Sequence, residues 1–256
     1  MIYVEQVPAF NDNYIWLLIQ SDNKHAAIVD PGEARPVLDK LKSANLIPAA
    51  ILITHHHADH TGGVKEILRY FDIPVYGPRN EKIPGRTHDL AEGDSVDLKD
   101  LSLHFTILDM PGHTAGAIAY YSDGMVFVGD TLFMSGCGRL FEGTPGQMHR
   151  SLAKLAALPD ETLVYCAHEY TLANLKFAAA VEPGNPDIQN RIEACQSLRE
   201  ADQPTVPGKM ADEKLTNPFL RTHIAAVAEA ARRYRRKELT DEIDVFAAIR
   251  NWKDNF

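Results

Sequence analysis

Short apolar runs separated by turn-forming residues dominate the first two thirds of the chain. Runs rich in isoleucine, leucine and valine predict β-strands, whereas apolar residues three or four positions apart predict amphipathic helices. The helical spacing is found at Val37, Leu38 and Leu41, so a helix is expected over residues 33–44. Further helices are expected at residues 64–71 and 148–157, and a loop-rich passage at residues 78–93. The expected strands are residues 2–7, 14–20, 25–29, 49–53, 75–76, 101–108, 117–121, 125–128 and, as the last strand, 162–166.

The pattern changes after Tyr170, from mixed strands and helices to helices alone. Helices are expected there at residues 172–181, 188–200, 224–237 and 243–252, separated by segments that contain proline and glycine. Before Tyr170, several neighbouring strands are joined by tight turns, which favours sheets with antiparallel hairpins covered by helices. The sequence therefore predicts an α/β (α+β) domain at residues 1–170 and a smaller helical domain at residues 171–256.

The formal net charge of −9 argues against a protein that binds nucleic acid, because contacts to phosphates require local positive charge. One basic run opposes this trend, Arg232-Arg233-Tyr234-Arg235-Arg236-Lys237. In an acidic chain we interpret it as the charged surface of a helix rather than as a site for nucleic acid.

Three cysteines, Cys137, Cys166 and Cys195, form no CxxC motif and leave an odd count, which is typical of a reducing compartment. The first ten residues lack a basic segment followed by an apolar core, so no secretory signal is visible. No apolar run approaches the roughly 20 residues that a membrane helix requires. We therefore expect a cytoplasmic protein that binds no membrane.

The densest group of candidate metal ligands follows the apolar strand at residues 49–53 and reads Thr54-His55-His56-His57-Ala58-Asp59-His60. Residues two apart on an extended chain lie on the same side, so His55 and His57 are expected to face one way and His56 another. Asp59 and His60 are expected at the bend that follows. A surface histidine run would not explain the aspartate, whereas imidazole and carboxylate donors at this spacing suit zinc or another first-row metal.

Three further candidate ligands, His113, Asp130 and His168, each lie just beyond an apolar strand. Loops at strand ends are where rigid sheets place catalytic groups. A lone histidine in such a position is commonly a structural hydrogen-bonding residue, but the joint occurrence favours a shared site.

Together with the histidine-rich segment they give seven donors, which is more than one tetrahedral ion needs. Seven donors suit two ions about 3.5–4 Å apart that share a carboxylate and a water-derived ligand. The histidines without this context are left outside the site: His25, His56, His88, His104, His149 and His223.

The order of these motifs resembles that of the metallo-β-lactamase superfamily. The motifs are His55-x-His57-x-Asp59-His60, Pro111-Gly112-His113-Thr114, Gly129-Asp130-Thr131 and Ala167-His168-Glu169-Tyr170. The loop Gly136-Cys137-Gly138-Arg139 and the basic pair Arg250 and Lys253 narrow the resemblance to glyoxalase II, the hydroxyacylglutathione hydrolases. The similarity extends from Pro8 to Phe256, nearly the full chain.

The resemblance implies an αββα sandwich whose helical C-terminal domain closes over the substrate. It also implies two divalent metal ions, expected to be zinc, with iron or manganese as alternatives. The implied ligands are His55, His57 and His113 for one ion, Asp59, His60 and His168 for the other, and Asp130 as the bridge. Asp30, before Pro31-Gly32, is either a support that orients ligands or a turn residue.

The reaction implied by the resemblance is the hydrolysis of S-(2-hydroxyacyl)glutathione thioesters, as in the conversion of S-D-lactoylglutathione to D-lactate and glutathione. This is the second step of methylglyoxal detoxification. A hydroxide that bridges the metals would attack the thioester carbonyl, with Asp59 as the catalytic residue that orients it. No cysteine nucleophile is needed, so we interpret Cys137, between two glycines, as a structural thiol. We expect a monomer whose partner is the small-molecule glutathione thioester.

The resemblance also implies substrate contacts that are mainly basic and aromatic: Arg139, Phe141, Tyr170, Arg250 and Lys253. Glutathione carries two carboxylates, which explains the basic residues. Phe141 stands where many members have a tyrosine, which removes a hydroxyl contact. Arg139 replaces the lysine of some members, which keeps the charge but changes its geometry.

Three other functions are compatible with a metal site of this kind. A persulfide dioxygenase on the same fold would use one iron, and the complete second set of ligands argues against it. The acidic net charge disfavours a metal-dependent nuclease. A metal-binding module that senses or scaffolds would not need the attached basic pocket.

Overall fold

The computed structural model describes the whole chain, residues 1–256. Contacts divide it into two compact units, the first made of Met1–Asp109 and Ala115–Gly129 and the second of Met110–Thr114 and Asp130–Phe256. The short segment Met110–Thr114 therefore leaves the first unit and contributes its residues to the second. The domain boundary that the sequence pattern predicts at residue 170 stays a prediction.

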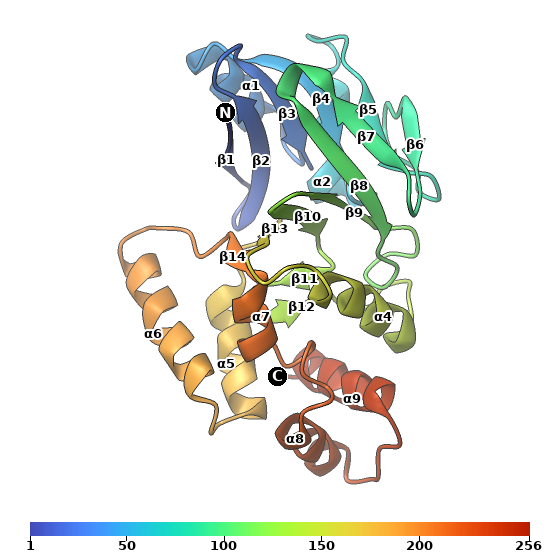
Figure 1. Cartoon of the computed structure of the whole chain (residues 1–256), viewed down its shortest axis with the longest axis vertical. Helices are drawn as coiled ribbons and strands as arrows, with labels where there is room; N and C mark the ends of the chain where they lie inside the picture. Colours follow the sequence, from blue (N-terminus) through green and yellow to red (C-terminus); the bar gives the residue numbers. More distant parts are fainter. The chain divides into compact units, whose positions relative to one another are not determined.

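The first unit contains a six-stranded sheet whose spatial order follows the sequence (Figure 1). Its first three strands pair antiparallel, and its third to sixth strands pair parallel. The strands are β1 (Ile2–Ala9), β2 (Asn13–Gln20), β3 (His25–Val29), β4 (Ile47–Leu52), β5 (Val75–Pro78) and β6 (His88–Leu90).

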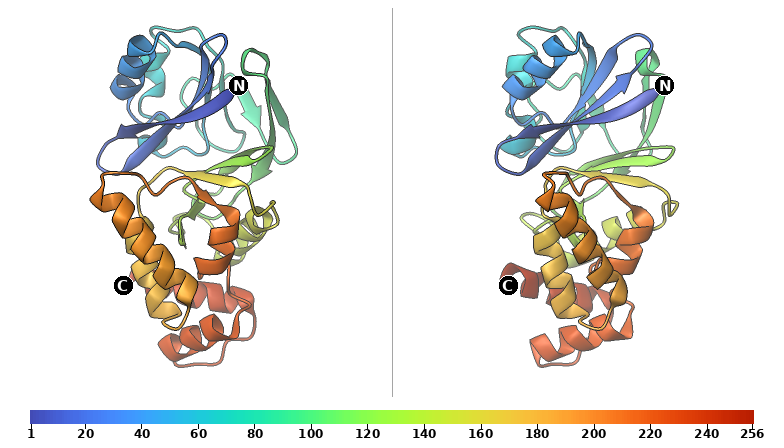
Figure 2. Two further views of the ribbon diagram at one scale, coloured as in Figure 1. Left: turned by 60° about the vertical axis from the view of Figure 1, so that its left-hand side comes forward. Right: turned by 90° about the vertical axis from the view of Figure 1, so that its left-hand side faces the viewer.

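Two helices cover one face of this sheet, α1 (Ala34–Ser43) and α3 (Val64–Ile67), on the side away from the second sheet (Figure 2). The apolar residues of α1 recur at helical spacing, and Val37 and Leu41 are buried against the sheet. One hydrophobic core of the first unit therefore lies between these helices and the strands, and it fixes the carboxyl ends of β3 and β4.

The second sheet of this unit is antiparallel, in the order β10, β9, β8, β7. The buried Tyr120 donates a hydrogen bond from its hydroxyl to the carbonyl oxygen of Ile53, at 2.9 Å, and so ties this sheet to the end of β4. The strands are β7 (Ser95–Leu98), β8 (Leu103–Asp109), β9 (Ile118–Ser122) and β10 (Met125–Gly129).

The second unit is mainly helical and carries two short strand pairs. Helices α5 and α6 lie side by side (Figures 1 and 2), and Leu175, Ala178, Ile188 and Cys195 form the core between them. The elements are β11 (Leu132–Phe133), β12 (Gly136–Cys137), α4 (Pro145–Ala156), β13 (Leu163–Cys166), α5 (Thr171–Val181), α6 (Pro186–Glu200), β14 (Gly208–Lys209), α7 (Met210–Thr216), α8 (Ala225–Arg235) and α9 (Glu242–Asp254).

The starts of several of these helices follow directly from the sequence. Thr144 and Gln147 form a capping box at α4, and Asn185 and Asp241 accept hydrogen bonds from the first turns of α6 and α9. None of the helices combines the length and the apolar character that crossing a lipid bilayer requires.

The mixed α/β class with a helical C-terminal part is confirmed, and the long elements lie within a few residues of the predicted ranges. Two predictions about these elements were wrong. The helix expected at residues 64–71 ends at Ile67, and residues 162–166 are not the last strand because β14 follows. The passage at residues 78–93 is rich in loops, as expected, and contains the short strand β6. The elements β7, β11, β12 and α7 were not predicted, since each is too short to show a period.

Gly32 gives a test of the packing around the histidine-rich loop. A Cβ atom at this position would overlap the carbonyl oxygen of Asp59 and lie 2.8 Å from the Phe10 ring. We expect Gly32→Ala to lower the free energy of unfolding by about 1–3 kcal/mol, because the backbone of Asp59 must shift. Urea denaturation measures the change. Gly184→Ala is the matched control, since nothing lies within 4 Å of its added Cβ; equal stability of the two variants would contradict the prediction.

Candidate metal centre and substrate pocket

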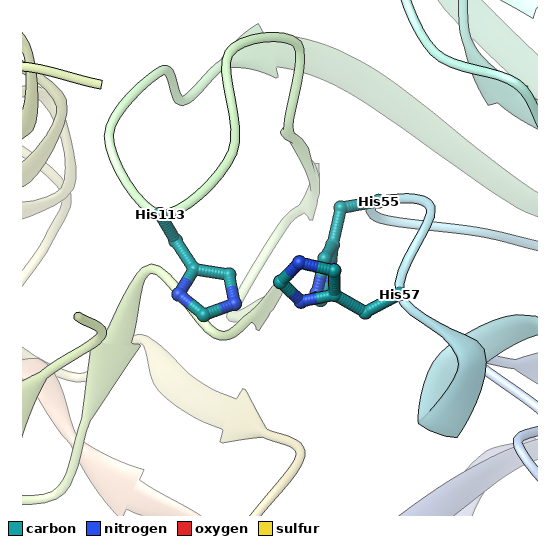
Figure 3. Close-up of side chains that lie close together, drawn as sticks. All are labelled: His55, His57 and His113. Atoms are coloured by element: carbon teal, nitrogen blue, oxygen red, sulfur yellow. The ribbon is translucent and has the colours of Figure 1, made fainter. Parts of the chain in front are cut away.

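The histidine-rich loop leaves β4 in an extended conformation that separates its three adjacent imidazoles. The Nε2 atom of His55 lies 3.2 Å from Nδ1 of His57, whereas His56 turns away and its Nδ1 lies 2.9 Å from a carboxylate oxygen of Glu81. The predicted alternation is therefore confirmed. Figure 3 shows the side chains of His55 and His57 on this loop.

The next two candidate ligands lie on a short helix rather than at a bend. Asp59 and His60 belong to α2 (Ala58–Thr61), and His60 is fully buried. Nε2 of His60 lies 3.5 Å from Oδ2 of Asp59, so the two side chains face the same space. One turn of helix brings adjacent residues into this arrangement, which a strand could not do.

Asp30 holds two of these histidines in place. Its Oδ1 accepts a hydrogen bond from the Thr54 backbone amide at 2.8 Å, and its Oδ2 lies 2.6 Å from the Thr54 hydroxyl and 3.0 Å from Nδ1 of His60. The same hydroxyl lies 3.0 Å from Nδ1 of His55. Partners on Nδ1 direct Nε2 of each ring toward a metal. Of the two interpretations of Asp30, the structure supports the one in which it orients ligands.

The second unit contains three more candidate ligands, two imidazoles on either side of one carboxylate. Oδ2 of Asp130 lies 3.5 Å from Nε2 of His113 and 3.4 Å from Nε2 of His168, and all three side chains are buried. Nδ1 of His113 lies 2.9 Å from the carbonyl oxygen of Arg139, which fixes that ring. An aspartate between two imidazoles is the arrangement that a bridging ligand needs.

A cavity of 390 Å³ in the second unit contains two of these candidate ligands and all five predicted substrate contacts. It is lined by His113, Asp130, Phe133, Cys137, Arg139, Phe141, Tyr170, Ala173, Asn174, Arg250 and Lys253. The sequence analysis did not assign Ala173 and Asn174 to the site. The sequence did not mark Phe133 as part of the site either.

The two cations of α9 are bound differently. Arg250 is buried: its Nη1 donates to the carbonyl oxygen of Cys137 at 2.8 Å and its Nη2 to Asp254 at 3.1 Å. Lys253 donates to the carbonyl oxygen of Ala173 at 3.1 Å. Burial, followed by repulsion from Arg250, lowers the pKa of Lys253 to about 8. The pocket therefore holds two cations in a poorly solvated place, which favours an anionic ligand.

Aromatic rings pack against the imidazoles of the second unit. The ring of Tyr170 lies parallel to that of His168, with centroids 4.7 Å apart, and Phe133 meets both rings edge-on. Phe141 contacts His113 in the same edge-on way at 5.3 Å, although 63% of Phe141 is exposed. Two predicted substrate contacts, Tyr170 and Phe141, thus also hold candidate ligands in place.

The hairpin β11–β12, which carries Phe133 and Cys137, is fixed by buried polar side chains that the sequence did not indicate. The Asn217 side-chain amide donates to the carbonyl oxygens of Phe133 and Gly136 at 3.3 and 2.9 Å. Glu213 accepts from the Ser135 backbone amide at 2.8 Å. These contacts join positions about 80 residues apart, and no sequence motif connects them.

Three of the histidines left outside the predicted site have other partners. His56 pairs with Glu81, His104 with Asp97 at 2.7 Å, and His149 lies 3.0 Å from the Thr222 hydroxyl. That these histidines lie outside the metal site stays a prediction.

The donor chemistry of the site fits divalent metal ions. Imidazole nitrogens and carboxylate oxygens, buried and oriented by neighbouring hydrogen bonds, are the ligands of zinc and of first-row metals generally. Within the first unit, Asp30, His55 and His60 bring one ligand atom each to within 4.8 Å of the others.

Comparisons with known proteins show the family to which the chain belongs. Residues 12–168 match the metallo-beta-lactamase superfamily, and residues 169–256 match the hydroxyacylglutathione hydrolase C-terminus. A hydroxyacylglutathione hydrolase from Nitrosomonas europaea is 54% identical over 256 residues, which are 100% of this chain and 97% of the relative. One from Aliivibrio salmonicida is 55% identical over 257 residues and covers 100% of both. The crystal structure of ETHE1 from Myxococcus xanthus has the same fold, with a TM-score of 0.67, 24% identity and 98% of each chain covered.

The match over residues 12–168 shows a protein of the metallo-β-lactamase superfamily, and its clustered histidine and aspartate side chains fit divalent metal ions. Because relatives more than half identical span the full chain, the assignment extends beyond the superfamily. The chain belongs to the hydroxyacylglutathione hydrolases, the glyoxalase II family of thioester hydrolases.

The environment of Cys137 predicts an unreactive thiol. It is buried, and burial raises the pKa of its thiol despite the nearby Arg250 guanidinium. At pH 7 we expect iodoacetamide to leave Cys137 unlabelled in the folded protein, because the thiolate is the reactive form. Mass spectrometry after timed labelling measures this, and the urea-unfolded protein, in which all three cysteines react, is the control. Rapid labelling of Cys137 in the folded protein would show that its thiol is activated.

Proposed function

We propose that this protein hydrolyses S-(2-hydroxyacyl)glutathione thioesters, and that S-D-lactoylglutathione gives D-lactate and glutathione in the second step of methylglyoxal detoxification. One observation carries the proposal: a single cavity is lined by the candidate ligands His113 and Asp130 and by the cations Arg139, Arg250 and Lys253. A thioester of an anionic tripeptide needs metal ligands and cations in the same cavity. Its carbonyl group must reach the metals while the cations bind its carboxylates. The names of the full-length relatives support the same reaction.

We assign His55, His57 and His113 to one divalent ion and Asp59, His60 and His168 to the other, with Asp130 shared between them. The distances of 3.5 and 3.4 Å from Asp130 to His113 and His168 support the shared role. When bound, two such ions lower the pKa of a water molecule and stabilise negative charge on the carbonyl oxygen. We propose zinc for both positions, and the same donors accept iron and manganese.

Asp59 is the residue that we assign to proton transfer. Its side chain is 40% exposed, so water reaches it directly. It orients the attacking water and takes its proton as the oxygen bonds to the thioester carbon. The carbon–sulfur bond then breaks, the electron pair leaves with glutathione sulfur, and the proton follows it. The acyl group leaves as the hydroxy acid.

The cations of the pocket hold the glutathione portion. The exposed Arg139 and the partly buried Lys253 are the groups that we assign to the two carboxylates. Both Nη atoms of Arg250 already donate within the protein, so this residue adds positive charge and supports the pocket wall. Phe141 lacks the hydroxyl that a tyrosine would offer, and its exposed ring supplies an apolar contact instead.

We propose a monomer in the cytoplasm. All three cysteines are free and buried, which is compatible with a reducing compartment.

The central test combines metal analysis and catalysis on one purified sample. We expect loss of the thioester absorbance of S-D-lactoylglutathione, and we expect chelation to abolish it and zinc to restore it. Asp59→Ala should lower kcat at least about 100-fold, because it removes a ligand and the proton acceptor together. Asp39→Ala, an exposed aspartate on α1, is the control and should keep full activity. No cleavage of the thioester by the metal-loaded protein would refute the proposed function, and undiminished cleavage after exhaustive chelation would refute the role of the metal ions.

The lowered pKa of Lys253 predicts pH-dependent binding. Lys253 is charged below its pKa of about 8 and neutral above it, so affinity for an anionic ligand should fall as the pH rises through 8. We expect S-methylglutathione to inhibit about tenfold more weakly at pH 9 than at pH 7, the ratio of charged lysine at the two values. Lys253→Arg keeps its charge and should flatten the profile. A native profile that matches the arginine variant would remove Lys253 from ligand binding.

A further inference from the structure

Asn13 is buried beside the candidate metal ligands and has no role in the assignment above. It begins β2, only 7% of it is exposed, and its Nδ2 donates a hydrogen bond to Oδ2 of Asp59 at 3.1 Å. In the sequence it is one of several turn-forming residues at positions 11–13, and nothing marks it as part of a site. The bond joins residues 46 positions apart.

We propose that Asn13 is a positioning residue for the thioester hydrolysis, because its side-chain amide fixes the Asp59 carboxylate for metal binding and proton transfer. The inference rests on the proposed function for its kinetic part, and on the structure alone for its metal-binding part.

The other candidate ligands show why Asp59 needs such a partner. His55 has the Thr54 hydroxyl, His60 has the Asp30 carboxylate, and His113 has the Arg139 carbonyl oxygen. Each of these ligands is buried, whereas the Asp59 side chain is 40% exposed on a helix of one turn. Water competes for an exposed carboxylate and leaves it several rotamers, so a buried donor at 3.1 Å selects one of them.

The position of Asn13 is itself fixed by the β1–β2 hairpin. The antiparallel register ends at the pair Ala9 and Asn13, and the backbone amide of Phe10 donates to Glu33 at 2.6 Å. The hairpin tip is thereby held to the chain beside Gly32, where the close approach of the Asp59 carbonyl leaves no room for a Cβ. The side chain of Asp59 is thus held by Asn13, and its backbone packs closely against Gly32.

The chemistry of an amide suits this role better than that of a charged donor. An uncharged N–H directs a carboxylate without neutralising it, so the full negative charge remains for a divalent ion. A lysine or arginine at this position would pair with Asp59 and compete with the ion. The structure therefore assigns to Asn13 the part of an uncharged support, as a backbone amide often plays in metal sites.

The test uses Asn13→Leu, which keeps a similar shape but has no donor, and Asn13→Ser, which is too short to reach Asp59. Asn11→Ala is the matched control, since Asn11 is an exposed amide in the same turn. We expect bound zinc to fall from two ions toward one per chain in the Asn13 variants, with affinity for the weaker site reduced about 10- to 100-fold. Metal analysis after gel filtration and chelator competition measure it.

Kinetics and thermal unfolding separate positioning from packing. We expect kcat to fall about 10- to 100-fold while KM stays within a factor of two, because the substrate cavity contains no part of the β1–β2 hairpin. The Tm of the metal-free variants should equal that of the metal-free native protein. Retention of both ions with full kcat in Asn13→Leu would overturn the proposal, as would an equal loss of Tm with and without metal. If the native protein binds two ions but cleaves no thioester, the proposed function fails while the metal result still tests Asn13.

Discussion

The candidate ligands of the first unit depend on the hydrogen bonds of one buried carboxylate, that of Asp30. Parallel pairing of β3 with β4 places Val29 beside Leu52, so Asp30 and Thr54 lie just beyond two adjacent strand ends. The Asp30 carboxylate accepts from the Thr54 amide and from its hydroxyl, and it pairs with His60. Removing it would leave these buried donors unsatisfied, and burial makes an unsatisfied polar group costly. The register between β3 and β4 therefore determines where these candidate ligands lie.

The second unit presents the opposite electrostatic problem, because it buries the positive charge of Arg250 and pairs it with the carboxylate of Asp254. Arg250 is held by the Cys137 carbonyl oxygen and by Asp254, and its guanidinium lies 5.0 Å from the centre of the Phe219 ring. Lys253 has fewer partners, and the poor solvation is expressed in its lowered pKa. A ligand with two carboxylates would place negative charge beside these cations, so the burial that lowers the pKa of Lys253 also favours an anionic ligand.

Much of the secondary structure could be predicted, because long elements show a regular period of apolar residues and helix starts carry characteristic capping residues. Elements of two to four residues, such as β6 and β14, have no period and are defined by the strand beside them. Similarly, the sequence predicted a bend at Asp59 and His60 instead of α2, because the four residues of α2 carry the ligand motif and show no helical pattern. The separation of His56 from its neighbours was predictable because alternation along an extended chain is a local property.

The sequence by itself determined which residues are candidate ligands and substrate contacts, because their spacing and the family motifs can be recognised without knowing how the chain folds. Only the tertiary structure decided that Asn13 bonds to Asp59, that Glu81 engages His56, and that Asn217 and Glu213 support the hairpin of the pocket. It also decided that Arg250 is buried with its Nη atoms engaged. These contacts join residues tens of positions apart in the sequence. Whether such residues meet, and whether they are buried, depends on how the strands and helices pack, and no local sequence pattern specifies that packing.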